Sequence, residues 1–347
     1  MTFPIRDRRI VLIGGAGFIG HNLALALRQR GAHVEVIDSL QVNNLVWFAS
    51  NNGDKQHRSL YLRMINQRLD MLHEAEIPIH VQDARDYHAL SRILTEIRPQ
   101  VVILLAAVAH AGRSNKDPFS TFDHSLRTLE NALDWARNGT EHFIYFSSSM
   151  VYGDFLTDEV DEEHPLNSIG IYGALKVAGE KIVIGYQQVF GIPYTIIRPS
   201  ALYGPRCVSR RVGQIFIENT LDGSKLRVDG DGSEKLDYTY IDDLVDGICL
   251  AIVNPAARNQ VFNMTYGSSR SILDLAKIIQ EHYPTVEVEF VERDHLMPLR
   301  GTLSIKKAQS LLGYVPRNPI EVGFQKYIEW YREFVQGNDL RAMVFAQ

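Results

Sequence analysis

Two side chains suited to proton transfer lie one helical turn apart in this sequence. Tyr172 and Lys176 fall within a stretch of helical apolar periodicity, 171–190, so they share one face of the predicted helix. A free tyrosine has a pKa of about 10 and is a poor base at neutral pH, but a nearby ammonium favours the phenolate. Three serines, Ser147, Ser148 and Ser149, end an earlier apolar strand, where parallel sheets bind ligands. The pattern predicts proton abstraction by Tyr172 beside a serine hydroxyl.

A glycine-rich stretch near the N-terminus has the form of a dinucleotide-binding turn. Residues 14–20 are GGAGFIG, preceded by an apolar strand and followed by an amphipathic helix. Glycines in this context let the backbone turn tightly and approach a pyrophosphate, while the helix N-terminus presents free N–H groups and a positive dipole end. The residues expected to bind the cofactor here are Gly14, Gly17, Phe18, Ile19 and Gly20.

An acidic residue, Asp38, ends the second predicted strand. A carboxylate at this position accepts hydrogen bonds from the adenosine ribose and repels the 2′-phosphate of NADP, so NAD is the predicted cofactor. Further contacts are expected at the ends of the third and fourth strands, where Asp83 and Ala84 lie near the adenine and Ala106 and Ala107 allow the cofactor to cross the sheet edge.

The elements that position these residues alternate between strands and helices. Such alternation implies right-handed crossovers and an α/β fold, a Rossmann-type doubly wound parallel sheet. Strands are predicted at 9–14, 33–38, 79–83, 101–107, 142–147 and 194–200, and helices at 18–30, 86–97, 119–137 and 171–190. The long segment 39–77 is predicted to be an insertion with a helix at 58–73, near the adenosine side or the substrate mouth.

Beyond residue 205 the pattern changes to that of a smaller C-terminal α/β substrate-binding lobe. Helices are predicted at 208–222, 241–253, 272–282 and 319–334, and strands at 226–228, 261–265 and 286–291. We expect residues 1–204, with about 237–265, to form the NAD-binding domain, and residues 205–236 and 266–347 to form the lobe.

Length and composition agree with two lobes and exclude several classes of protein. The 347 residues exceed the roughly 100–200 of a typical domain. A net charge of −5 argues against nucleic-acid and membrane-surface partners, and no apolar run approaches the about 20 residues of a membrane helix. Without a signal-peptide pattern, and with only Cys207 and Cys249, we expect a cytoplasmic protein with reduced thiols and no metal site. An excess of arginine (26, against 10 lysines) favours a phosphorylated ligand.

Taken together, these motifs resemble the extended short-chain dehydrogenase/reductase superfamily, in its NAD-dependent sugar-nucleotide epimerase/dehydratase branch. The resemblance covers nearly the whole chain, through residues 14–20, Asp38, 147–153, Tyr172 and Lys176, 198–205, 229–232 and 237–243. It implies that Ser148 hydrogen-bonds the sugar oxygen, that Tyr172 takes the C4 hydroxyl proton while hydride passes to NAD, and that Lys176 binds the nicotinamide ribose and lowers the Tyr172 pKa.

The residues after the catalytic serine favour one reaction within that branch. Dehydratases place Asp-Glu after this serine, and glucuronate decarboxylases keep a Glu before Val-Tyr-Gly, whereas this chain has Ser149 and Met150. Because methionine transfers no proton, the chain is similar to a 4-epimerase, in which the ketone turns over and takes the hydride back. A decarboxylase, dehydratase, reductase or epimerase at another carbon stays open, as does a noncatalytic NAD-sensing or scaffold protein.

Departures from the branch's pattern concern the substrate, a nucleoside-diphosphate sugar. Ala201 replaces a common Asn, Leu236 replaces an Arg that contacts the diphosphate, and residues 303–304 are Leu-Ser instead of Tyr/Ala-Asp. Other cations must then bind the diphosphate, with Arg293 the best placed among Arg206, Arg210, Arg211, Arg293 and Arg300. The remaining predicted substrate contacts are His110, Arg113, Ser149, Met150 and Ala201. Relatives of this branch commonly dimerise, which predicts a homodimer formed through the helices at 119–137 and 171–190.

Overall fold

Seven parallel strands form the central sheet of the computed structural model, which describes residues 4–50, 57–108, 111–293 and 296–344. The strands are β1 (Arg9–Ile13), β2 (His33–Asp38), β3 (Ile79–Val81), β4 (Val101–Leu104), β5 (His142–Phe146), β7 (Tyr194–Arg198) and β12 (Gln260–Asn263). Their order across the sheet is β12-β7-β5-β4-β1-β2-β3. The order reverses at β1, and such a reversal opens a ligand crevice at the carboxyl ends of the strands. The predicted Rossmann-type doubly wound sheet is confirmed.

Helices cover both faces of this sheet, because alternate strand residues point to opposite sides. Ile10 and Leu12 of β1 pack in one core cluster, whereas Val11 and Ile13 pack in another. The first face carries α1 (Phe18–Gln29), α3 (Arg58–Glu74) and α10 (Ile241–Val253); the second carries α4 (Tyr87–Ile97), α7 (Thr128–Ala136) and α8 (Gly170–Phe190).

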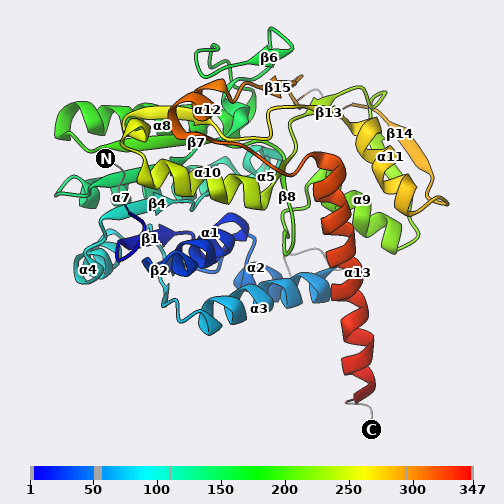
Figure 1. The fold of residues 1–347 in the computed structure, drawn as a ribbon, viewed down its shortest axis with the longest axis horizontal. Coiled ribbons are helices and arrows are strands. Elements are labelled where there is room, and N and C mark those ends of the chain that lie inside the picture. Colours follow the sequence, from blue (N-terminus) through cyan, green and yellow to red (C-terminus); the bar gives the residue numbers. More distant parts are fainter. Residues whose placement is uncertain (1–3, 51–56, 109–110, 294–295, 345–347) are drawn as a thin grey trace.

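A smaller group of elements lies beside the sheet (Figure 1). Its parallel pair is β9 (Leu226–Asp229) with β14 (Val288–Val291), near α9 (Val212–Leu221), α11 (Ile272–His282) and α13 (Ile320–Val344). Short strand pairs connect it to the sheet: β8 (Leu202–Tyr203) with β11 (Thr239–Tyr240), β10 (Lys235–Leu236) with β13 (Arg270–Ser271), and β6 (Glu159–Val160) with β15 (Thr302–Leu303). The other helical segments are α2 (Leu45–Ala49), α5 (Ala111–Lys116), α6 (Pro118–Phe122), η1 (Asp123–Arg127), η2 (Ser149–Val151), η3 (Pro255–Ala257) and α12 (Lys306–Leu312).

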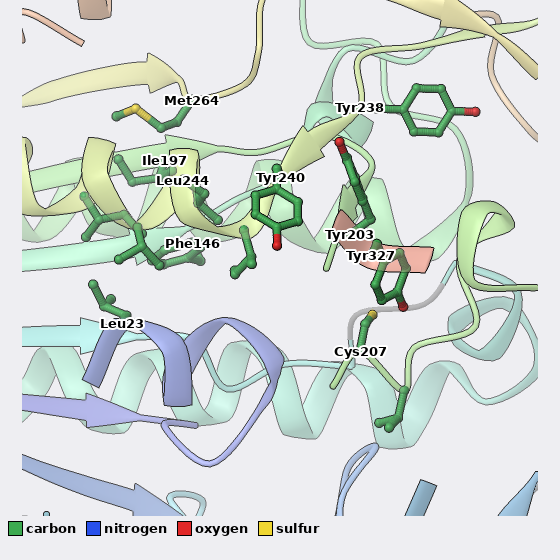
Figure 2. Close-up of a cluster of buried hydrophobic side chains, with 14 of the residues drawn as sticks. Leu23, Phe146, Ile197, Tyr203, Cys207, Tyr238, Tyr240, Leu244, Met264 and Tyr327 are labelled. Carbon is green, nitrogen blue, oxygen red and sulfur yellow. The ribbon is translucent and has the colours of Figure 1, made fainter. Parts of the chain in front are cut away.

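One hydrophobic core runs from the sheet into this second group. Figure 2 shows Tyr240 between the sheet side chains, such as Ile197, and a set of aromatic residues that includes Tyr203 and Tyr327. The Tyr203 ring lies 5.4 Å from that of Tyr240 and stacks on Phe324 at 4.3 Å. Because the core is shared, the two parts pack as one hydrophobic unit and position the cavities between them.

Several predicted boundaries differ from the structure. The single helix predicted at 119–137 is instead α6, the wider π-helical turn η1, and α7. Helix α5 was not predicted, since AGRSNK has no apolar period. The strand predicted at 101–107 stops at Leu104, because the N–H groups of Leu105 and Ala106 both donate to the Ile13 carbonyl and leave the ladder.

Helix α13 extends ten residues past its predicted end at Phe334, and in Figure 1 its last turns project below the rest of the chain. Arg63 of α3 holds its middle part, with Nη2 2.7 Å from the Phe334 carbonyl and the guanidinium 4.8 Å from the Phe334 ring. Within the described residues, none of the helices has both the length and the apolar character needed to cross a membrane.

Candidate active site

The glycine stretch makes a tight turn between β1 and α1. Gly14 has a φ of +85°, and a Cβ there would lie 2.6 Å from the backbone nitrogen of Ala106. Gly17 is the N-cap of α1 and provides no side-chain acceptor for the first N–H groups of the helix. Uncapped backbone donors at the positive end of a helix dipole are suited to a pyrophosphate.

A cavity of about 1050 Å³, here called the glycine-loop cavity, opens against this turn. All the predicted cofactor contacts from the glycine stretch and the strand ends line it: Gly14, Gly17, Phe18, Ile19, Gly20, Asp38, Asp83, Ala84, Ala106 and Ala107. Residues separated by up to 93 positions therefore meet in one place, with the size and donor groups that a dinucleotide needs.

The Asp38 carboxylate is held by two backbone donors at the end of β2. The N–H of Ala16 lies 3.0 Å from Oδ2 and that of Leu40 lies 2.8 Å from Oδ1. Burial raises the pKa of Asp38, and these two hydrogen bonds act against that rise. Each carboxylate oxygen keeps a further lone pair, so the group fits the two hydroxyls of an adenosine ribose.

Arg68 lines the same cavity, and sequence reasoning did not identify it. The side chain comes from α3, in the predicted insertion, and is fully buried. It donates through Nε and Nη2 to the Arg206 carbonyl, while its buried Nη1 has no acceptor among the described residues. Burial lowers the pKa of Arg68 to about 10. The only signal in the sequence was the unusual length of the segment between β2 and β3.

Ser148, Tyr172 and Lys176 meet in a second cavity of about 590 Å³, here called the junction cavity. Ser148 is the N-cap of η2, and its Oγ accepts from the Met150 N–H at 3.2 Å. A Cβ on Gly173 would lie 2.8 Å from the Met150 carbonyl oxygen, so glycine permits the close approach of α8 that brings Tyr172 to Ser148. Lys176 donates to the Phe146 carbonyl at 2.6 Å.

The buried surroundings of this triad shift its pKa values in opposite directions. Burial raises the pKa of Tyr172, and the Arg211 charge and a hydrogen bond with Ser148 act against that rise. Burial lowers the pKa of Lys176 to about 8, and Glu180 opposes it. Burial therefore dominates the Tyr172 pKa in the protein alone, and the groups that lower this pKa are Arg211 and Ser148, where the resemblance implied Lys176.

Glu180, on the same face of α8 as Tyr172 and Lys176, is a residue that sequence reasoning missed. Its carboxylate accepts two hydrogen bonds from Arg198, 2.9 Å from Nε and 2.7 Å from Nη2, and one from the Ser147 hydroxyl. Arg198 also donates to Tyr152. This buried network ties α8 to the ends of β5 and β7; its signal was the spacing of 172, 176 and 180.

A third cavity, the lobe cavity of about 1190 Å³, lies between the two parts of the molecule. It shares six residues with the junction cavity: Met150, Tyr172, Ala201, Leu202, Arg211 and Arg300. Arg210 and Arg293 line it as well, together with Arg227, which sequence reasoning missed. Arg293 Nε lies 3.9 Å from the Glu234 carboxylate, and Leu236 occupies the wall where an arginine was expected.

Of the other predicted substrate contacts, Ser149 lies in the junction cavity and Arg206 faces α1. Arg206 faces α1, with Nε 3.0 Å from His21 Nε2, and is absent from the linings of these three cavities. Ser149 lines the junction cavity. Arg113 belongs to α5, whereas His110 lies outside the described residues.

Comparison with known proteins agrees with this geometry. Residues 10–265 match the NAD dependent epimerase/dehydratase family. The chain belongs to this family. The predicted resemblance, NAD as the cofactor, and an NAD-dependent enzyme of the sugar-nucleotide epimerase class are thereby confirmed.

Relatives of this family member carry more than one activity. A UDP-glucose 4-epimerase from Mycolicibacterium smegmatis is 28% identical, over 93% of this chain and 98% of its own. UDP-glucuronic acid decarboxylase 1 from Xenopus tropicalis is 27% identical, over 94% and 73%. The crystal structure of a UDP-glucuronic acid 4-epimerase from Bacillus cereus, in complex with UDP-glucuronic acid and NAD, is 26% identical with a TM-score of 0.80, over 93% and 99%.

Proposed function

We propose that this protein is an NAD-dependent epimerase acting at C4 of a nucleoside-diphosphate sugar. The observation that carries the proposal is the junction cavity, where Ser148, Tyr172 and Lys176 meet with Ser149 and Met150 and with no carboxylate among its described lining residues. Elimination of water by a dehydratase, and loss of CO₂ by a decarboxylase, each require a proton-transferring side chain at position 149 or 150.

Each residue of the site has a definite task in this reaction. Bound NAD supplies the acceptor and donor of the C4 hydride. Tyr172 Oη takes the proton from the C4 hydroxyl and returns it after the ketone has turned over, so the reaction consumes no acid or base. The Ser148 hydroxyl holds the sugar oxygen, and Lys176, anchored on the Phe146 carbonyl, orients the cofactor's ribose.

The two domains that we propose have the bounds predicted from the sequence. Residues 1–204, with about 237–265, bind NAD, and residues 205–236 and 266–347 hold the sugar nucleotide over the junction cavity. Arg293 and Arg210 line the lobe cavity and are the proposed diphosphate contacts. Arg206 is not a proposed diphosphate contact, because its guanidinium donates hydrogen bonds to His21 and Asn22.

Conversion of one sugar nucleotide into its C4 epimer, with no net NADH, tests the proposal. Tyr172→Phe should retain NAD and lose turnover, while Tyr186→Phe, on the same helix but outside the junction cavity, should keep it. Release of water or CO₂ would assign a dehydratase or decarboxylase instead. Binding of NAD with no turnover across UDP-, GDP-, CDP- and dTDP-sugars would favour a noncatalytic sensor or scaffold.

We also propose a cytoplasmic homodimer formed through α8 and the segment 119–137, which comprises α6, η1 and α7. Phe119 and Val189 on these elements are 85% and 73% exposed, and a partner subunit packed on both elements would cover them. The two buried, unpaired thiols agree with a reducing compartment. Light scattering should give twice the chain mass for the wild type and the monomer mass for Phe119→Glu with Val189→Glu; a monomeric wild type would contradict the proposal.

A further inference from the structure

Arg206 connects two elements of the cofactor site, although it is absent from the described linings of the three cavities. Its guanidinium lies behind α1 and is partly buried, with Nε 3.0 Å from His21 Nε2. Its backbone carbonyl accepts hydrogen bonds from Nε and Nη2 of Arg68, on α3. Arg206 has a φ of +64°, a left-handed conformation that few residues other than glycine adopt, and both contacts are made from it.

His21, in the first turn of α1, is fully buried and has a partner at each ring nitrogen. Nδ1 lies 2.9 Å from the Gly17 carbonyl oxygen, which can only accept, and Nε2 faces the Arg206 Nε–H, which can only donate. The ring is therefore the neutral tautomer with its proton on Nδ1. Burial lowers the pKa of His21 well below its usual value, and the charges of Arg68 and Arg206 lower it further. A neutral imidazole thus links Arg206 to Gly17 through two hydrogen bonds.

The Gly17 carbonyl belongs to the same peptide group as the Phe18 N–H. Phe18 lines the glycine-loop cavity, and the N–H groups of the first helical turn have no partner within the helix. The carbonyl accepts from the His21 ring and, at 3.1 Å, from the His21 backbone N–H. Hydrogen bonds in a chain polarise one another, so donation to this carbonyl makes the Phe18 N–H a stronger donor. A helix start with strengthened donors is suited to a pyrophosphate.

A second donor at the same cavity depends on Arg206. Its carbonyl holds two of the three guanidinium nitrogens of Arg68, and the third, the buried Nη1, has no acceptor among the described residues. Arg68 is fully buried and lines the glycine-loop cavity. A buried cationic donor without an acceptor is suited to an anionic ligand, and the phosphates are the only anionic groups of NAD.

We propose that Arg206 is a positioning residue for NAD. Through His21, its side chain strengthens the Phe18 N–H as a donor to the pyrophosphate, and its carbonyl orients Arg68 for the same phosphates. This role rests on the NAD cofactor of the family and not on the reaction proposed at C4. It gives Arg206 and His21 an effect on cofactor affinity without contact with the cofactor.

Release of bound NAD from the full-length holoenzyme tests this role, and exchange against isotopically labelled NAD measures the release rate. Arg206→Gln and His21→Leu should each raise that rate by about 10-fold, the value of one net hydrogen bond. Arg206→Lys, which keeps a cationic donor, should recover part of the loss. Because the Arg206 side chain acts through His21, the double variant should release NAD no faster than His21→Leu alone.

Arg332→Gln is the matched control. Arg332 is also a partly buried arginine that donates to a ring-bearing side chain, with Nε 3.1 Å from the Tyr283 hydroxyl, and it is absent from the described linings of the three cavities. This variant should release NAD at the wild-type rate. In ¹H–¹⁵N spectra of the holoenzyme, the Phe18 amide proton should move upfield in Arg206→Gln, as a weaker hydrogen bond does, and keep its position in Arg332→Gln.

The wild type provides a test that needs no variant. In ¹⁵N spectra the His21 ring should carry its proton on Nδ1 and stay neutral between about pH 5 and 8. A protonated ring at neutral pH, or a proton on Nε2, would overturn the role proposed for Arg206. Additive increases in the double variant, or a wild-type release rate in Arg206→Gln, would overturn it as well, and each of these outcomes would leave the epimerase proposal intact.

Discussion

Removal of the Glu180 carboxylate should destabilise the protein more than any exposed charge does. Glu180 and Arg198 form a two-contact ion pair at 2.7 and 2.9 Å, with side-chain exposures of 1% and 4%. Glu180→Gln keeps the shape but leaves the Arg198 charge buried with only neutral acceptors. Loss of one partner of such a pair costs about 3–5 kcal/mol, which for a chain of this length lowers Tm by roughly 4–7 °C.

Urea and thermal unfolding of the NAD-free protein measure this cost. Glu287→Gln is the control, because Glu287 pairs with Lys225 at 2.6 Å with both side chains largely exposed, and it should leave the midpoint unchanged. The double variant Glu180→Leu with Arg198→Met removes both charges and should be more stable than Glu180→Gln. If Glu180→Gln unfolds at the same midpoint as Glu287→Gln, the buried charge is not what stabilises the contact between α8 and β7.

Three further perturbations follow from the described contacts. Arg68→Gln should lower the NAD retained per protomer, because Arg68 lines the glycine-loop cavity and its buried Nη1 has no acceptor among the described residues. Arg63→Gln, on the same helix but outside that cavity, should retain NAD, and equal retention in both variants would refute this role. Gly173→Ala should lower kcat with NAD content unchanged, since its Cβ would meet a backbone carbonyl of η2 at 2.8 Å and displace Tyr172; a wild-type kcat would show that the helix moves freely. Burial raises the pKa of Asp237 from 3.8 to about 7. The wild type should therefore lose stability relative to Asp237→Asn as pH rises from about 4 to 7, by at most about 4 kcal/mol. Urea denaturation of both proteins at pH 5 and pH 8 measures this, and the free energy of unfolding of the wild type, relative to that of the variant, should be lower at pH 8.

The cofactor side could be predicted because its chemistry lies within single elements and at strand ends. The glycine stretch, Asp38 and the Tyr172–Lys176 pair each depend on spacings of a few residues, and a parallel sheet brings its strand ends to one edge. The ten cofactor contacts predicted from strand ends and the glycine stretch accordingly line one cavity.

The substrate side could not be predicted in the same way, because its contacts depend on how distant elements pack. Arg206 was expected at the diphosphate, yet its guanidinium reaches His21, 185 residues away in the chain, and its carbonyl accepts from Arg68. No local pattern of charge indicates which arginine of five faces a cavity and which faces a helix.

The sequence by itself therefore determined the fold class and the cofactor, and it predicted the three residues Ser148, Tyr172 and Lys176 that meet in the junction cavity, since regular secondary structure converts short spacings into shared faces. Only the tertiary structure brought Arg211 and Arg300 to the catalytic end of the lobe cavity. It also joined Glu180 to Arg198 and exposed Phe119 and Val189. The reason is physical: a side chain's partners across the molecule are selected by burial and packing of whole elements, which no single stretch of sequence contains.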